Sequence, residues 1–162
     1  MNEQLLAKID TATQAMWTDK PADVARMVGR NFDTGKEFSV WAYSWGYLSN
    51  LGDLMYEYFQ LGNEGALDLA TLKALAARQC RRYADSFEHS AHMSDTYTLL
   101  REAAEGFERV EDHAGFAKLA RTLQRFLMQM SFWIDIELPW AEVCAFIDKR
   151  WHDEAAARDT RE

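Results

Sequence analysis

Residues 34–60 read TGKEFSVWAYSWGYLSNLGDLMYEYFQ, and this stretch decides the fold. Thr34 and Glu37 form a T-x-x-E capping box, in which two side chains satisfy free amides at the start of a helix. At about 100° of rotation per residue, the apolar residues that follow recur at alternating intervals of three and four. This spacing is typical of the seam between closely packed antiparallel helices, so we predict a long helix here. The seam contains Phe38, Trp41, Trp45, Leu48, Gly52, Met55 and Phe59.

The aromatic residues between Trp41 and Tyr47 also alternate, which is a strand pattern. The capping box before them and the helical seam through them outweigh that pattern, and we predict helix. A helix that is apolar on two faces must bury both, and a second stripe lies about a third of a turn from the first. It contains Val40, Tyr43, Tyr47, Leu51, Leu54 and Tyr58.

Two arrangements would bury the second stripe: the helix is central in a bundle, or the stripe is a subunit interface. Tyrosine suits an interface because its hydroxyl tolerates a partly wet surface. As partner-binding residues of a homodimer we therefore predict Tyr43, Tyr47, Leu51, Leu54 and Tyr58. A third interpretation is an aromatic pocket for a flat ligand, lined by Trp41 and Trp45.

Similar patterns predict helices along the rest of the chain, and the two prolines and eight glycines are few. Gly62 is a natural helix end, Asn63 is a suitable N-cap, and a further long helix is expected to begin at Asp112. Helices are expected over residues 2–17, 21–28, 34–60, 63–92, 94–107, from 112 to Pro139, and from Pro139 onward. The predicted fold is an all-α, single-domain bundle over 1–162, with about six or seven helices, long antiparallel core helices and a frayed tail at about 155–162.

The chain carries a net charge of −8 and has a pI of about 5.0. An acidic surface repels phosphate backbones, which argues against nucleic-acid binding. No apolar run approaches membrane-spanning length, and the charged first residues do not form a signal peptide. Cys80 and Cys144 lie far apart and are expected to be reduced and buried. We expect a cytoplasmic protein with no cofactor and no membrane partner.

Residues 78–92, RQCRRYADSFEHSAH, place their polar side chains on one arc of the helix predicted there. Asp85 with His89 and Glu88 with His92 are four residues apart, so each pair could share a metal ion. The candidate metal ligands are therefore Asp85, Glu88, His89 and His92. They lie opposite the apolar face, whereas di-iron bundles project their ligands inward. The other interpretation is a solvated helix face with alternating charges.

Arg82 and His89 stand two turns apart on the same predicted face. Arg82-x6-His89 resembles the Arg-x(4–6)-His motif of HEPN-type helical ribonucleases, in which both residues act on a phosphodiester without metal. The resemblance covers these two residues only, and it implies catalytic roles for Arg82 and His89. It departs from the family at Tyr83, where a small polar residue is usual.

The predicted helix from Asp112 turns apolar on its outer face at Met128, Phe132 and Ile136. That surface needs cover, either from the last helix or from a partner subunit. The sequence contains no Gly-rich phosphate loop, nucleophile elbow or HExxH motif. The leading hypothesis is a non-catalytic interaction or assembly module, an accessory, adaptor or small subunit that forms a homodimer. The alternative is a small helical enzyme, metal-dependent or ribonuclease-like, that uses residues 78–92.

Overall fold

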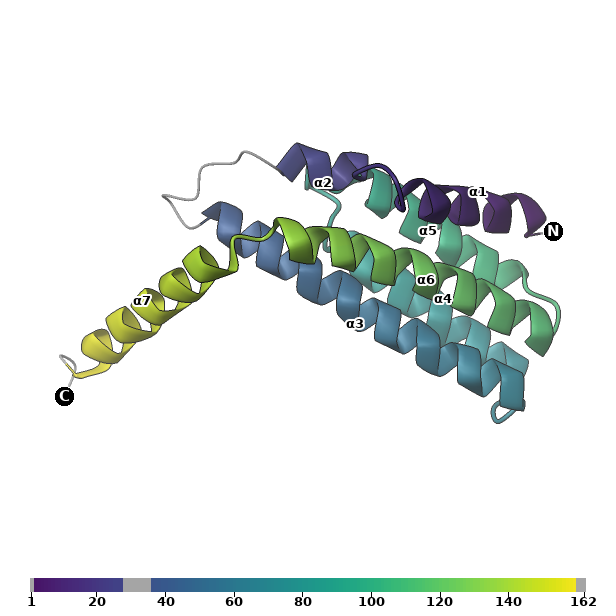
Figure 1. Ribbon diagram of the computed structural model, residues 1–162. Coiled ribbons are helices and arrows are strands. Elements are labelled where there is room, and N and C mark those ends of the chain that lie inside the picture. Colours follow the sequence, from purple (N-terminus) through teal and green to yellow (C-terminus); the bar gives the residue numbers. More distant parts are fainter. Residues whose placement is uncertain (1, 28–35, 160–162) are drawn as a thin grey trace.

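The computed structural model describes residues 2–27 and 36–159, and the side chains of all of these except 36–39 and 159. Within them the chain forms seven helices and no strand, which confirms the predicted all-α bundle (Figure 1). The helices are α1 Glu3–Ala15, α2 Ala22–Met27, α3 Lys36–Glu64, α4 Leu69–Asp85, α5 Ser94–Arg109, α6 His113–Glu137 and α7 Trp140–Asp159.

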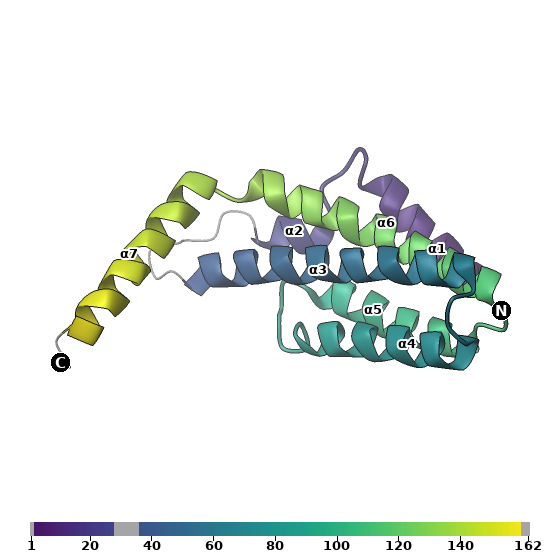
Figure 2. The same cartoon turned by 90° about the horizontal axis from the view of Figure 1, so that it is seen from below.

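Two antiparallel helix pairs form the body of the bundle (Figure 2). One pair is α3 and α6, which pack along most of their length, and the other is α4 and α5. The helix α1 covers α6 and α5, and the short α2 lies at the start of α5. The last helix, α7, extends away from the bundle beyond the end of α6 (Figures 1 and 2).

The helix α3 is the central helix, because both of its stripes are covered within the chain. On the first stripe Leu48 and Met55 are buried, and a Cβ at Gly52 would meet the Met128 side chain of α6. On the second stripe Leu51 and Tyr58 are buried. Segment 41–47 is helical, as predicted. The capping box at Thr34 and Glu37 lies outside the residues described with side chains.

The predicted end of α3 at Gly62 is wrong. The helix continues to Glu64, and Gly62 is buried where an added Cβ would lie 2.8 Å from Phe116 Cδ1. Because glycine has no side chain, α3 and α6 can pack closely at Gly62. Gly65 ends the helix, with a φ of 64° that suits glycine.

The predicted N-cap at Asn63 is also wrong, because Asp68 caps α4. Its carboxylate accepts hydrogen bonds from the Thr71 amide at 3.0 Å and the Thr71 hydroxyl at 2.7 Å. These bonds lower the pKa of Asp68 below its usual range. The helix α6 begins next to Asp112, close to the predicted start, and the Asp112 carboxylate caps it by accepting a hydrogen bond from the Gly115 amide at 2.7 Å.

Two further boundaries differ from the predictions. The helix α4 ends at Asp85 instead of running to residue 92. The helix α7 continues to Asp159, so residues 155–159 are helical where a frayed tail was predicted. None of the helices in the described residues is long and apolar enough to cross a membrane.

Candidate interaction surface

The polar residues between Arg78 and His92 do not share one helix face. Since α4 ends at Asp85, Glu88, His89 and His92 lie in the irregular segment that leads to α5. The helical spacings that would pair Asp85 with His89, and Glu88 with His92, therefore do not apply. The His89 side chain is almost wholly exposed, and its Nε2 lies 3.9 Å from a Glu88 carboxylate oxygen.

The four predicted metal ligands are near one another without forming a ligand set. Asp85, His89 and His92 border an open depression of about 600 Å³ beside Tyr43. Among the described residues, however, no group of three His, Cys, Asp or Glu side chains is placed to hold a metal ion. Asp85 instead lies 3.9 Å from the Arg101 guanidinium of α5.

The two predicted catalytic residues, Arg82 and His89, do not lie on one helix either. Arg82 is exposed on α4, and it borders an open depression together with Arg78, Arg81 and Glu108. His89 borders the other depression, beyond the end of the helix. The premise of two side chains on one helical face, which carried the ribonuclease interpretation, is wrong.

A polar cluster that sequence reasoning missed is built around Asp23 of α2. The Asp23 carboxylate is buried and accepts hydrogen bonds from the amides of Asp95 and Thr96, at 3.3 and 2.8 Å, and from the Thr96 hydroxyl. Arg26 pairs with both Asp23 and Asp95. Asp23 thus caps α5 from another helix. The sequence carries no local signal for this contact between residues 73 positions apart.

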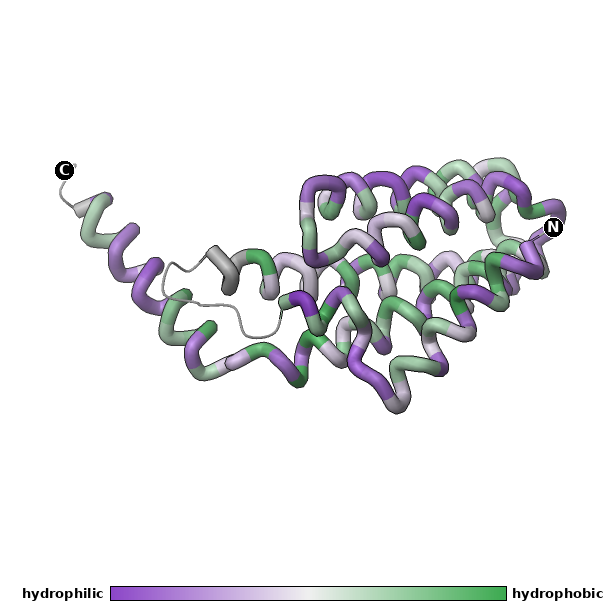
Figure 3. The backbone as a smooth tube through the Cα atoms, turned by 90° about the horizontal axis from the view of Figure 1, so that it is seen from above, coloured by the Kyte–Doolittle hydropathy of each residue, from purple (hydrophilic) through white to green (hydrophobic). Residues whose placement is uncertain are grey.

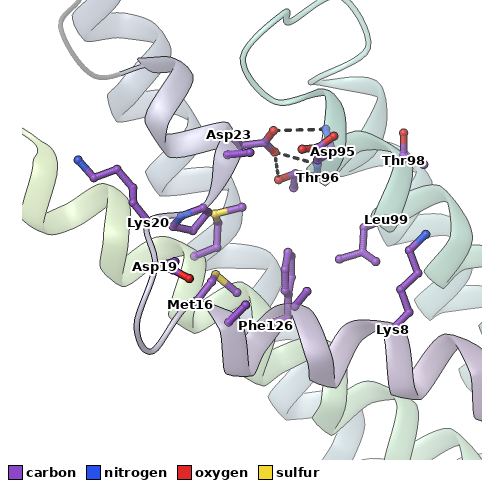
Figure 4. Close-up of a pocket in the computed structure, with 15 residues that line it drawn as sticks. Lys8, Met16, Asp19, Lys20, Asp23, Asp95, Thr96, Thr98, Leu99 and Phe126 are labelled. Atoms are coloured by element: carbon purple, nitrogen blue, oxygen red, sulfur yellow. Dashed lines mark hydrogen bonds between the residues drawn. The ribbon is translucent and has the colours of Figure 1, made fainter.

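A cavity of about 460 Å³ lies beside this cluster, between α1, α2, α5 and α6 (Figure 4). Its wall is apolar, formed by Met16, Leu99, Phe126 and Met130. Five of the described charged residues line it: Lys8, Asp19, Lys20, Asp23 and Asp95. Asp23 and Asp95 pair with Arg26. Lys8 pairs with Glu102 at 2.7 Å, and Lys20 pairs with Glu137 at 2.6 Å.

The predicted partner-binding residues are, with one exception, part of the bundle. Leu51 and Tyr58 are core residues, and Leu54 packs against the core. The Tyr47 ring meets the Tyr83 ring edge-on at 5.3 Å between centroids. Only Tyr43 of the five is exposed. The second stripe of α3 is therefore not a free subunit interface, because α4 covers it.

Six of the ten large hydrophobic side chains that are exposed among the described residues lie on the end of α6 and on α7. On α6, Phe132 is 54% exposed and Ile136 52%, so α7 does not cover the outer face of α6. On α7, Ile147 is 55% exposed and Trp151 63%. Figure 3 shows hydrophobic segments recurring along α7 although this helix lies away from the bundle. We call the following six residues the interaction surface: Met128, Phe132, Ile136, Trp140, Ile147 and Trp151.

The first turn of α7 contacts the end of α6 and the helix α3. The Trp140 indole Nε1 donates a hydrogen bond to the Asp135 carbonyl at 3.0 Å. Its ring also meets the Trp45 ring of α3 edge-on, with centroids 5.6 Å apart. Val143, one turn further on, is buried. Cys144 beside it is exposed, so the prediction of two buried cysteines holds for Cys80 alone.

A groove of about 700 Å³ runs between the end of α1 and the outer face of α6. The Trp133 indole of α6 donates a hydrogen bond to the Met16 carbonyl at 2.6 Å and fixes the two walls together. Met128 and Phe132 of the interaction surface line this groove, as does the exposed Trp17. Among the described residues, its charged lining residues are Arg121 and Arg125, and none is acidic.

No protein-family model, curated protein or solved structure matches the chain. The protein is therefore classed by its fold alone, as an all-α bundle with one projecting helix.

Proposed function

We propose that the protein is a non-catalytic helical assembly module that forms a homodimer in the cytoplasm through the interaction surface. The observation that carries the proposal is that one chain exposes two apolar regions, the outer face of α6 and the stripe of α7. Exposed apolar side chains gathered in this way mark contact sites, whereas isolated ones are ordinary. A second copy of the chain supplies the matching apolar surface.

The composition of the surface suits a protein partner. Two tryptophans and a phenylalanine are among its six residues, and tryptophan is the side chain most enriched at the centres of interfaces. Each aromatic ring buries about 150–250 Å² when it is fully covered. The net charge of −8 opposes a nucleic-acid partner, and the proposal involves no cofactor.

Sedimentation velocity over a range of protein concentrations tests the proposal with a matched pair of variants. Trp151→Asp places a charge within the α7 stripe and should convert a dimer into a monomer. His152→Asp introduces the same side chain on the neighbouring exposed residue, outside the stripe, and should leave the dimer unchanged. Circular dichroism should show equal helix content in both variants. A wild-type protein that is monomeric at all concentrations would overturn the proposal.

A further inference from the structure

We infer that α7 of one copy occupies the groove between α1 and α6 of a second copy, antiparallel to that α6, and that the exchange is reciprocal. The inference rests on the proposed homodimer and names the site that each copy offers to the other. It follows from the residue pattern of the two surfaces, their charges and the way in which α7 is anchored.

The two surfaces carry complementary patterns at the same spacing. Going outward along α7, one stripe of exposed residues contains Ile147, Trp151 and Glu154, at intervals of four and three. Going back along α6 from its end, the exposed residues are Ile136, Phe132, Met128 and Arg125, and the last three have the same intervals. Residues at these intervals form one stripe on a helix.

Antiparallel packing aligns the two stripes residue by residue. When Ile147 faces Phe132 of the second copy, Trp151 faces Met128 and Glu154 faces Arg125. Two apolar contacts are then followed by one ion pair. The ion pair uses one of the two arginines that line the groove. One step further in this register, Arg158 of α7 faces Arg121, so the charges attract at Glu154 and repel at Arg158.

Glu154 is available for this pairing. In the single chain its carboxylate lies 3.5 Å from Arg150 of the same helix, with both side chains largely exposed. Exposed pairs four residues apart contribute little free energy. Replacing that pair by one at the edge of a hydrophobic interface therefore costs little.

The anchoring of α7 explains why the occupied groove belongs to another copy. Only Leu138 and Pro139 connect α6 to α7, and Leu138 is buried. The hydrogen bond from Trp140 to Asp135, the contact with Trp45 and the burial of Val143 direct α7 away from its own α6. To fold back on its own groove, α7 would have to break all of these contacts.

Reciprocal exchange gives a closed assembly with two identical contacts, as a two-fold axis requires. Each contact covers the Trp151 ring of one copy and the Phe132 ring of the other. Together the two contacts cover four aromatic rings, which contribute on the order of half of the roughly 1,200 Å² buried in small specific interfaces. The adjoining aliphatic side chains and the Trp17 ring enlarge the buried area.

A charge exchange between Arg125 and Glu154 tests the register. Arg125→Glu and Glu154→Arg should each weaken the dimer about tenfold, as loss of a close ion pair at an interface does. The double variant should restore the dissociation constant to near the wild-type value. Matched controls are Lys118→Glu, an exposed residue of α6 outside the groove, and Asp153→Arg, the exposed neighbour of Glu154. Both should leave the dimer unchanged.

The outcomes separate this inference from the proposed function. If the dimer forms and Trp151→Asp disrupts it, but the double variant does not restore binding, another pairing of α7 is correct and the inference is overturned. If the protein is a compact monomer and the double variant restores what the single variants lose, α7 binds the groove of its own chain. That outcome would also overturn the inference. A wild-type protein that never dimerises removes the proposed function itself.

Discussion

The Asp23 carboxylate of α2 accepts a hydrogen bond of 2.8 Å from the backbone amide of Thr96, in the first turn of α5. The residue at the N-cap position of α5 itself, Met93, offers no side-chain hydrogen bond. The free amides at the start of α5 are therefore satisfied from a different helix. A buried carboxylate with this many donors is stabilised as long as every donor stays in place.

Asp23→Ala should lower the free energy of unfolding by about 2–3 kcal/mol, because it leaves two amides without their acceptor and Arg26 without its buried partner. Asp23→Asn keeps a side-chain oxygen and should lose less. Urea denaturation followed by circular dichroism measures both values. An alanine variant as stable as the wild type would show that water replaces the carboxylate at this position.

The two cysteines should differ sharply in reactivity. Burial raises the pKa of the Cys80 thiol from 9.0 to about 12, whereas Cys144 is exposed. Ellman's reagent at pH 8 should therefore find one reactive thiol in the folded chain and two in denaturant. Because the folded pKa is raised, the stability linked to Cys80 is complete below pH 9 and is lost as the pH rises toward 12. Two rapidly reacting thiols in the folded chain would contradict this.

Gly46 and Gly62 lie in the same helix and should respond oppositely to alanine. At Gly46 an added Cβ meets nothing within 4 Å, so alanine should raise the free energy of unfolding by about 0.5–1 kcal/mol through its higher helix propensity. At Gly62 the Cβ would lie 2.8 Å from Phe116 Cδ1 and 3.3 Å from the Ala117 backbone nitrogen. Alanine there should cost about 1–3 kcal/mol by overpacking. Equal midpoints in thermal unfolding would contradict the assignment of Gly62 to the helix interface.

The helices could be predicted from the sequence because the signals that specify them are local. The apolar seam of α3 is read from intervals of three and four, and the start of α6 is read from the position of Asp112 before a periodic segment. Both kinds of signal depend on residues within a few turns of one another. The same is true of the α6–α7 boundary, which Pro139 marks.

The predictions that failed depend on contacts between distant residues. Gly62 looks like a helix end until Phe116 is placed against it. The second stripe of α3 looks free until Tyr83 and Phe87 cover Tyr47. The region after Asp85 keeps a helical pattern although the chain turns there toward α5. For the candidate site, the sequence indicated that Met128, Phe132 and Ile136 need cover, but the direction of α7 could not be read from it.

The anchoring of α7 at Trp140 and Val143 has a consequence for its outer turns. Of the side chains described beyond Ile147, all except Ala155 are exposed, and local pairs such as Arg150 with Glu154 form along the helix. Isolated helices of this length are marginal in water. In the proposed dimer, order in the outer turns and occupancy of the groove are therefore linked equilibria, in which part of the binding free energy offsets the cost of folding the segment that binds.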